Sequence, residues 1–181
     1  HLSVLVGDLL FIARQGSGAA KLKIKPVDLT ELVRSVVGDA KVIAMNKDIG
    51  IEFADDAPQE TIDCDPARLR QLLLIVLDNA VRYSKAKGKV DVRLSRENGT
   101  VTIKVADQGV GIPQEDLDNI FERFRRAGNA AEANDEGLGL GLPVARAIVQ
   151  AHGGAIDVQS KFGEGTTVLV SLPEKLGGSQ A

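Results

Sequence analysis

The 181-residue chain has little of what marks several common functional classes. It contains no tryptophan, one tyrosine and one cysteine, and aromatic residues make up 3% of it. The formal net charge is −3, so we expect neither a basic surface for nucleic acid nor an aromatic platform for single-stranded bases. The lone Cys64 excludes an internal disulfide, which fits a reducing cytoplasm.

A long hydrophobic run is also missing. The apolar stretch from Leu2 to Ala13 is interrupted by Asp8 and is well short of the roughly 20 residues that cross a bilayer. It lacks the basic leader and the cleavage site of a signal peptide. Its apolar residues recur at intervals of three and four, which predicts an amphipathic helix that packs on a partner. We therefore expect a cytoplasmic chain without direct membrane contact, whether or not a longer parent protein is anchored in a membrane.

Apolar residues make up 44% of the chain, which is ample for one aliphatic core. Alternating apolar residues predict strands at 21–25 (ended by Pro26), 51–53, 62–64, 90–94, 101–105, 156–158 and 168–172. Apolar spacing of three and four predicts helices after the capping residues Asp28 and Asp65, and at 113–124 and 140–151. This order of elements predicts an α+β fold, a two-layer sandwich of a mixed, mostly antiparallel sheet against about three helices.

Three glycine-marked turns surround one acidic residue in the second half of the chain. Asp107 ends an expected strand and precedes Gly109 and Gly111, and a Gly-x-Gly-x-Gly run from Gly137 to Gly141 precedes a helix. Glycine leaves no Cβ to keep a ligand away, and a helix N-terminus offers free N–H groups to an anion such as phosphate. No strand runs directly into Gly137 and no Gly-Lys-Ser/Thr follows, which excludes a dinucleotide fold and a P-loop.

Two further features accompany these turns. Residues 127–136 are small and polar without periodicity, which predicts a mobile loop that acts as a lid. Asn79 lies beside the apolar stripe of the helix that Asp65 caps, where an asparagine is costly unless it is hydrogen-bonded or faces a ligand. A partly exposed Asn79 at the edge of the stripe is the alternative interpretation.

Taken together, the motifs stand in a characteristic order: Asn79-Ala-x-x-Tyr83, Asp107-x-Gly-x-Gly111, Phe121-x-x-Phe124, Gly137-x-Gly-x-Gly141 and Gly163-x-Gly165-Thr166. This ordered set resembles the catalytic ATP-binding domain of sensor histidine kinases, in the gyrase/chaperone/kinase ATPase superfamily with the Bergerat fold. The resemblance implies a catalytic domain at 19–174. Before it, residues 1–18 would be the end of the second dimerisation-domain helix and a linker, and residues 175–181 would be a flexible tail.

The resemblance also implies binding of ATP with Mg²⁺. Asp107 would accept a hydrogen bond from the adenine amino group, Asn79 would hold Mg²⁺ through its amide oxygen, and Arg82 would pair with a phosphate. Asn79 and Arg82 would thus be the catalytic residues. Phe121 and Phe124 would anchor the lid by packing. The other implied nucleotide contacts are Tyr83, Gly109, Gly111, Gly137, Leu138, Gly139, Leu140, Gly141 and Thr166.

The reaction implied by the resemblance is transfer of the γ-phosphoryl group to a histidine on the dimerisation domain of a homodimer, for relay to a response regulator aspartate. Neither His1 nor His152 has the sequence context of that acceptor, so we expect it outside this sequence. Ile75 departs from the family pattern, because many members carry Asn there and hydrolytic relatives carry Glu. This departure leaves open the alternative that the chain is a nucleotide-binding signalling module with weak or no kinase activity. A further alternative is a serine kinase that sequesters a sigma factor. The helix predicted before Arg14 argues against this alternative.

Overall fold

The computed structural model describes residues 21–56, 61–125, 128 and 138–175. The segment expected to end a dimerisation helix, at 1–18, lies outside the described residues. Three further parts of the sequence also lie outside the described residues: Gly137, nearly all of the expected lid at 127–136, and all but the first residue of the expected tail at 175–181.

The main sheet has five strands. Its spatial order is β2 (Gly50–Asp55), β4 (Lys89–Glu97), β5 (Thr100–Asp107), β7 (Gly165–Pro173) and β6 (Ala155–Lys161). The β2 and β4 strands are parallel, and every other neighbouring pair is antiparallel. The prediction of a mixed, mostly antiparallel sheet is therefore confirmed.

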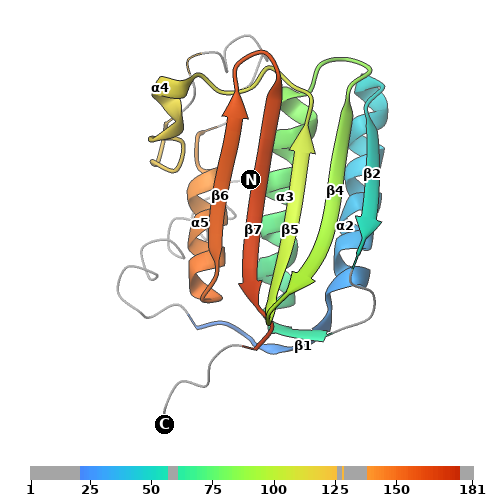
Figure 1. The fold of residues 1–181 in the computed structure, drawn as a ribbon, viewed down its shortest axis with the longest axis vertical. Helices are drawn as coiled ribbons and strands as arrows, with labels where there is room; N and C mark the ends of the chain where they lie inside the picture. The colour runs from blue at the N-terminus through green and yellow to red at the C-terminus, as the bar shows by residue number, and fades with distance from the viewer. Residues whose placement is uncertain (1–20, 57–60, 126–127, 129–137, 176–181) are drawn as a thin grey trace.

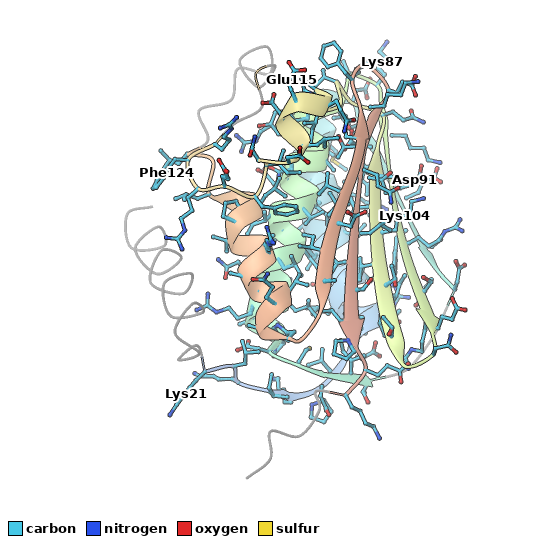
Figure 2. The ribbon with its side chains drawn as sticks, turned by 60° about the vertical axis from the view of Figure 1, so that its left-hand side comes forward. Lys21, Lys87, Asp91, Lys104, Glu115 and Phe124 are labelled. Atoms are coloured by element: carbon cyan, nitrogen blue, oxygen red, sulfur yellow. The ribbon has the colours of Figure 1, made fainter. Side chains whose placement is uncertain are left out.

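Three long helices cover one face of this sheet (Figure 1). They are α2 (Leu29–Ala44), α3 (Pro66–Tyr83) and α5 (Gly141–Ala151). Between the two layers lies the aliphatic core, in which Leu72 and Ile148 from the helices and Ile103 from the sheet are at most 1% exposed. On the opposite face of the sheet Asp91 and Lys104 point away from the helices (Figure 2). The α+β sandwich is thus confirmed, and a sheet buried on one face only explains the alternation of its strands.

The two helix starts that the sequence marked are capped as predicted. Asp28 accepts a 3.0 Å hydrogen bond from the backbone N–H of Glu31 at the start of α2. Asp65 accepts two such bonds at the start of α3, and Pro66 occupies the first helical position, where a missing N–H costs nothing. The tight turn between β4 and β5 is formed by the dipeptide Asn98-Gly99, with φ of 50° and 75°.

The first predicted strand is wrong in its bounds. The strand β1 is Lys25–Asp28 rather than 21–25, and it pairs antiparallel with β3 (Thr61–Cys64) in a separate two-stranded sheet. Pro26 therefore lies inside the strand that it was expected to end. A two-stranded sheet leaves one side of each strand unpaired, so a residue without an N–H is tolerated there.

The helix predicted at 113–124 is also wrong in length. The helix α4 spans only Gln114–Leu117, and the chain continues in turns. The N–H of Glu122 donates to Asn119 O at 2.9 Å, three residues back rather than the four of an α-helix. Phe124 has a left-handed φ of 62°, and its N–H donates to Gly139 O at 3.1 Å. A distant backbone partner thus replaces the helical one.

The ends of the elements gather at two poles of the domain (Figure 1). At one pole lie the ends of β5 and α3, the β6–β7 turn and the start of α5. At the other lie the β1–β3 sheet, the start of α3 and the end of α5. All the site residues that the sequence predicted and the structure describes belong to the first pole.

Candidate functional site

Asp107, the last residue of β5, is fixed through one of its two carboxylate oxygens. Oδ1 accepts the backbone N–H groups of Gly109 at 2.8 Å and of Thr166 at 3.2 Å. Within the described part of the chain, Oδ2 has no hydrogen-bond partner. Burial raises the pKa of Asp107 to about 6, against the effect of the two N–H bonds. Near neutral pH the residue therefore offers a desolvated carboxylate oxygen to a hydrogen-bond donor.

The glycines around Asp107 allow backbone segments of the protein to approach one another. A Cβ on Gly109 would lie 2.3 Å from Tyr83 O. Gly111 has φ +66°, and a Cβ there would lie 2.1 Å from Lys161 O. Gly165 has φ +129°, and a Cβ would lie 2.1 Å from Asp107 O. In the structure these glycines are approached by the β6–β7 turn and by the end of α3, which set the walls around Asp107, whereas the approach of a ligand stays a prediction.

Ser160 is a residue of this region that the sequence gave no reason to single out. Its hydroxyl accepts the N–H of Ile112 at 2.8 Å and lies 2.9 Å from both Gly165 O and the Thr166 hydroxyl. These contacts fix Thr166 beside Asp107. A serine near the end of a strand has no distinctive spacing in the sequence. Ser160 acquires its role only because its strand, β6, pairs with β7.

The last turns of α3 carry three of the predicted residues. Asn79, Arg82 and Tyr83 are all half-buried, so Asn79 occupies the partly exposed edge of the apolar stripe. The Arg82 guanidinium already forms a 2.8 Å ion pair with Asp78, four residues earlier on the helix. Tyr83 contributes its carbonyl, which accepts the N–H of Val110 at 3.1 Å and ties α3 to the loop after Asp107.

The start of α5 has no side-chain cap among the described residues. Leu140, at the N-cap position, is buried and forms no capping bond, so in that part of the chain the N–H groups of Gly141 and Leu142 lack a side-chain cap, and Pro143 has no N–H. Gly139 has φ +66°, and a Cβ there would lie 2.5 Å from Arg125 O, while Leu138 is exposed. A Cβ on Gly141 would lie 3.2 Å from Ile75 Cγ2. The residue that departs from the family pattern therefore packs directly against the helix start.

The two phenylalanines expected to pack differ from each other. The Phe121 ring is half-buried and lies 5.2 Å from the Arg146 guanidinium, a cation–π contact with α5. Phe124 is 65% exposed and points away from the domain (Figure 2), so the expectation that it packs is wrong.

The described residues contain no group of three or more acidic, cysteine or histidine side chains that could hold a metal ion. A Mg²⁺ bound beside Asn79 would therefore take most of its ligands from phosphate and water, as this ion commonly does. None of the described helices is both long and apolar enough to span a membrane.

Comparison with known proteins identifies the class. Residues 64–176, more than half of the chain, match the family of histidine kinase-, DNA gyrase B- and HSP90-like ATPases, to which the chain therefore belongs. The matched range contains Asn79, Asp107 and Gly141, so it covers the pole described above.

Within this class the similarity is to sensor histidine kinases. The chain is 34% identical to the sensor histidine kinase YkoH of Bacillus subtilis (strain 168), over 99% of this chain and 38% of YkoH. It is 32% identical to the circadian input-output histidine kinase CikA of Synechococcus elongatus, over 97% of this chain and 24% of CikA. It is thus a histidine kinase ATPase domain that spans well under half the length of these relatives.

Solved structures agree with this assignment. Full-length ShkA in complex with AMPPNP superimposes with a TM-score of 0.83 at 35% identity, over 98% of this chain and 36% of ShkA. The Acinetobacter baumannii histidine kinase AdeS superimposes with a TM-score of 0.77 at 25% identity, over 96% of this chain and 78% of AdeS. The predicted fold and family are confirmed.

Proposed function

We propose that the chain binds Mg·ATP at the pole formed by the end of β5 and the start of α5, and donates the γ-phosphoryl group to a histidine. That histidine would lie on a dimerisation domain outside this sequence, and a response regulator aspartate would receive the phosphoryl group next. The proposal is carried by Asp107, whose Oδ1 is fixed by two backbone N–H groups while Oδ2 has no hydrogen-bond partner among the described residues. Membership of the ATPase family and the AMPPNP bound to ShkA support it.

The site residues divide between the two ends of the nucleotide. Asp107 would accept the adenine amino group, with Tyr83 and the backbone around Gly109, Gly111 and Thr166 forming the walls. Asn79 would hold Mg²⁺, which neutralises phosphate charge, and Arg82 would exchange Asp78 for a phosphate. The phosphates would bind the backbone of Gly137, Leu138, Gly139, Leu140 and Gly141. Phosphoryl transfer requires chiefly such positioning and charge neutralisation.

The partners follow from the kind of protein to which the chain is similar. The two relatives described above are histidine kinases of which this chain covers less than half. We propose that residues 1–18 connect the catalytic domain at 19–174 to the dimerisation domain of a homodimer. The receiver domain of a response regulator would be the second partner.

Asp107→Asn tests the adenine site by calorimetry with Mg·ATP. The substitution keeps an oxygen for the two N–H groups but places an NH₂ where Oδ2 faces the adenine amino group. Loss of a charged hydrogen bond is worth about 1.5–3 kcal/mol, so we expect affinity to fall about ten- to a hundred-fold. Asp91→Asn, on the open face of the sheet, is the matched control and should bind like the wild type (Figure 2). Equal affinities for both variants would contradict the assignment.

Ile75 supports a second candidate, a nucleotide-binding module without transfer, because it packs against Gly141 at the phosphate end. An aliphatic side chain there can neither bind Mg²⁺ nor polarise water. Incubation of the chain with labelled ATP and a separate dimerisation domain decides between the two. Labelled phosphohistidine supports the kinase, whereas tight ATP binding without label supports the module. In the second case Ile75→Asn should restore label if this position alone limits transfer.

A further inference from the structure

Three segments of the chain meet at Asp65, the N-cap residue of α3. The start of α3 lies at the pole opposite the proposed nucleotide site (Figure 1). Its Oδ2 accepts a 2.8 Å hydrogen bond from the backbone N–H of Lys23, in the stretch that leads into β1. Its Oδ1 accepts the N–H groups of Ala67 and Arg68 at the start of α3, at 3.1 and 3.2 Å. Its own N–H donates to Nε2 of His152, just after α5, at 3.0 Å. Asp65 therefore joins the leading stretch, α3 and α5.

His152 completes this junction. The side chain is 1% exposed, and because Nε2 accepts a backbone N–H, the ring hydrogen is on Nδ1. Nδ1 donates to Ile148 O at 2.8 Å, one turn earlier in α5. Burial lowers the pKa of His152, against the effects of the Ile148 bond and the nearby Asp65 carboxylate. A neutral imidazole thus fixes the last turn of α5 to the first turn of α3.

The other end of α5 is the proposed phosphate site. There Gly141 packs against Ile75 of α3, so the same two helices are in contact at both ends of α5. The helix has 11 residues and buries most of its side chains. Such a packed element moves as one body, so a shift at His152 is carried to the N–H groups at Gly141.

We propose that Asp65 and His152 are positioning residues that couple the backbone at Lys23 to the phosphate-binding end of α5. The coupling rests on the proposed function, because what it changes is nucleotide affinity. Residues just before Lys23 are those through which a preceding domain would act on this one. Movement of that stretch would remove the Lys23 N–H from Asp65, release the backbone of Asp65 from His152 and loosen α5. Binding linkage is reciprocal, so ATP at Gly141 would in turn favour the Lys23 bond.

The first test breaks the junction at its outer bond. Lys23→Pro removes the backbone N–H, whereas the matched control Lys23→Ala keeps it, and the Lys23 side chain is exposed. Coupling free energies of about 1–3 kcal/mol predict that Lys23→Pro weakens Mg·ATP binding by about five-fold or more, with Lys23→Ala unchanged. Equal affinities of the two variants would overturn the proposal. If the wild type does not bind ATP, the proposed function itself fails.

The second test asks whether the effect passes through His152. In a His152→Leu background, Lys23→Pro should have no further effect on ATP affinity, while His152→Gln, which keeps an acceptor, should restore part of the wild-type affinity. Independent, multiplying effects of the two substitutions would show that the route is not shared.

Amide hydrogen exchange gives a readout that needs neither nucleotide nor His152→Leu, should that variant not fold. The N–H of Val144 closes the first turn of α5 on Leu140 O at 3.0 Å. We expect it to exchange faster in Lys23→Pro than in Lys23→Ala, about five-fold if the coupling is at the lower bound above. Identical protection of the Val144 N–H in the two variants would contradict the proposed coupling, even if ATP binds normally.

Discussion

At the scale of single residues, Asp107 combines a fixed oxygen, Oδ1, with an oxygen, Oδ2, that has no hydrogen-bond partner in the part of the chain that the structure describes. Two backbone N–H groups hold Oδ1, and burial raises the pKa to about 6, so the carboxylate is charged near neutral pH and protonated in mild acid. The charged form accepts a hydrogen bond at Oδ2, and the protonated form can donate one. At the proposed adenine site the residue would therefore distinguish an amino group from a carbonyl group on a bound base, in a way that depends on pH.

Nucleotide preference should follow this titration. Inosine triphosphate carries a carbonyl group where ATP carries its amino group, with the same phosphates. Above pH about 6 we expect ATP to bind about ten-fold more tightly, and below it the ratio of dissociation constants should shrink towards one. Calorimetry across this pH range measures the ratio of the two dissociation constants. The titration of the phosphates cancels from this ratio because both nucleotides carry the same phosphates. In Asp107→Asn the ratio should not change with pH, and a constant ratio in the wild type would contradict the role of Asp107.

Gly111 is a residue on which folding itself depends. Gly111→Ala would combine a left-handed backbone with a Cβ 2.1 Å from Lys161 O. Strain of about 1–2 kcal/mol for the backbone and about 1–3 kcal/mol for overpacking predict a loss of about 2–5 kcal/mol in the free energy of unfolding. Gly163→Ala is the control, since Gly163 has φ +83° but nothing within 4 Å of its Cβ position, and should cost about 1–2 kcal/mol. Urea unfolding compares them, and equal losses would mean that the contact with Lys161 relaxes.

At the scale of elements, α3 runs between the two poles, as α5 does. Its start is held by Asp65, and its last turns carry Asn79, Arg82 and Tyr83. Burial favours the neutral form of Asp65, but hydrogen bonds from three backbone N–H groups and the nearby His152 outweigh it, so the pKa is lowered. The stability that Asp65 contributes is therefore complete above the unfolded pKa of 3.8 and is lost as the pH falls through the lower folded pKa.

The two helix caps should differ in their contribution to stability. Asp28→Ala removes one exposed hydrogen bond at the start of α2 and should cost about 1 kcal/mol. Asp65→Ala removes three hydrogen bonds from a residue that is 6% exposed and should cost about 2 kcal/mol or more. Urea unfolding at neutral pH measures both. A loss for Asp65→Ala no larger than for Asp28→Ala would mean that α3 is held by packing alone.

Element boundaries could be predicted where the signal is local. The start of α3 after Asp65 depends on residues adjacent in sequence and was predicted correctly, and the Asn98-Gly99 turn depends on adjacent residues in the same way. The predicted helix at 113–124 was wrong because the N–H of Phe124 bonds to Gly139, which lies well outside the segment. Apolar spacing within the segment cannot reveal a competing hydrogen bond to a residue outside it.

At the scale of the whole molecule, the buried His152 and the half-buried Asp107 make stability depend on pH with opposite signs. His152 has a folded pKa below its unfolded 6.5, so stability falls as the pH drops below 6.5. Asp107 has a folded pKa of about 6, above its unfolded 3.8, so stability rises as the pH drops from about 6 towards 3.8. In the wild type the two slopes oppose each other, each reaching at most about 1.4 kcal/mol per pH unit.

Replacing either Asp107 or His152 should reveal the effect of the other residue on the pH dependence of stability. In Asp107→Asn the free energy of unfolding should fall more steeply than in the wild type as the pH drops from 6.5 to 4, because only His152 of this pair still titrates. In His152→Gln it should fall less steeply than in the wild type, or rise, below pH about 6. Urea unfolding at a series of pH values gives these curves. Curves that run parallel for all three proteins would show that neither group titrates differently in the folded state.

The sequence by itself determined the family, the sandwich of sheet and helices, and the segments that end at the site. The family was indicated by the resemblance of the ordered motifs to those of known kinases. The sandwich and its segments rest on apolar periodicity and on turn and cap residues, whose effect is exerted within a few positions along the chain. Only the tertiary structure decided which oxygen of Asp107 is free, that Ile75 lies against Gly141, and that Asp65 bonds to His152, 87 positions away. Contacts of this kind are made when helices pack on a sheet, so burial and geometry fix them and no local pattern specifies them.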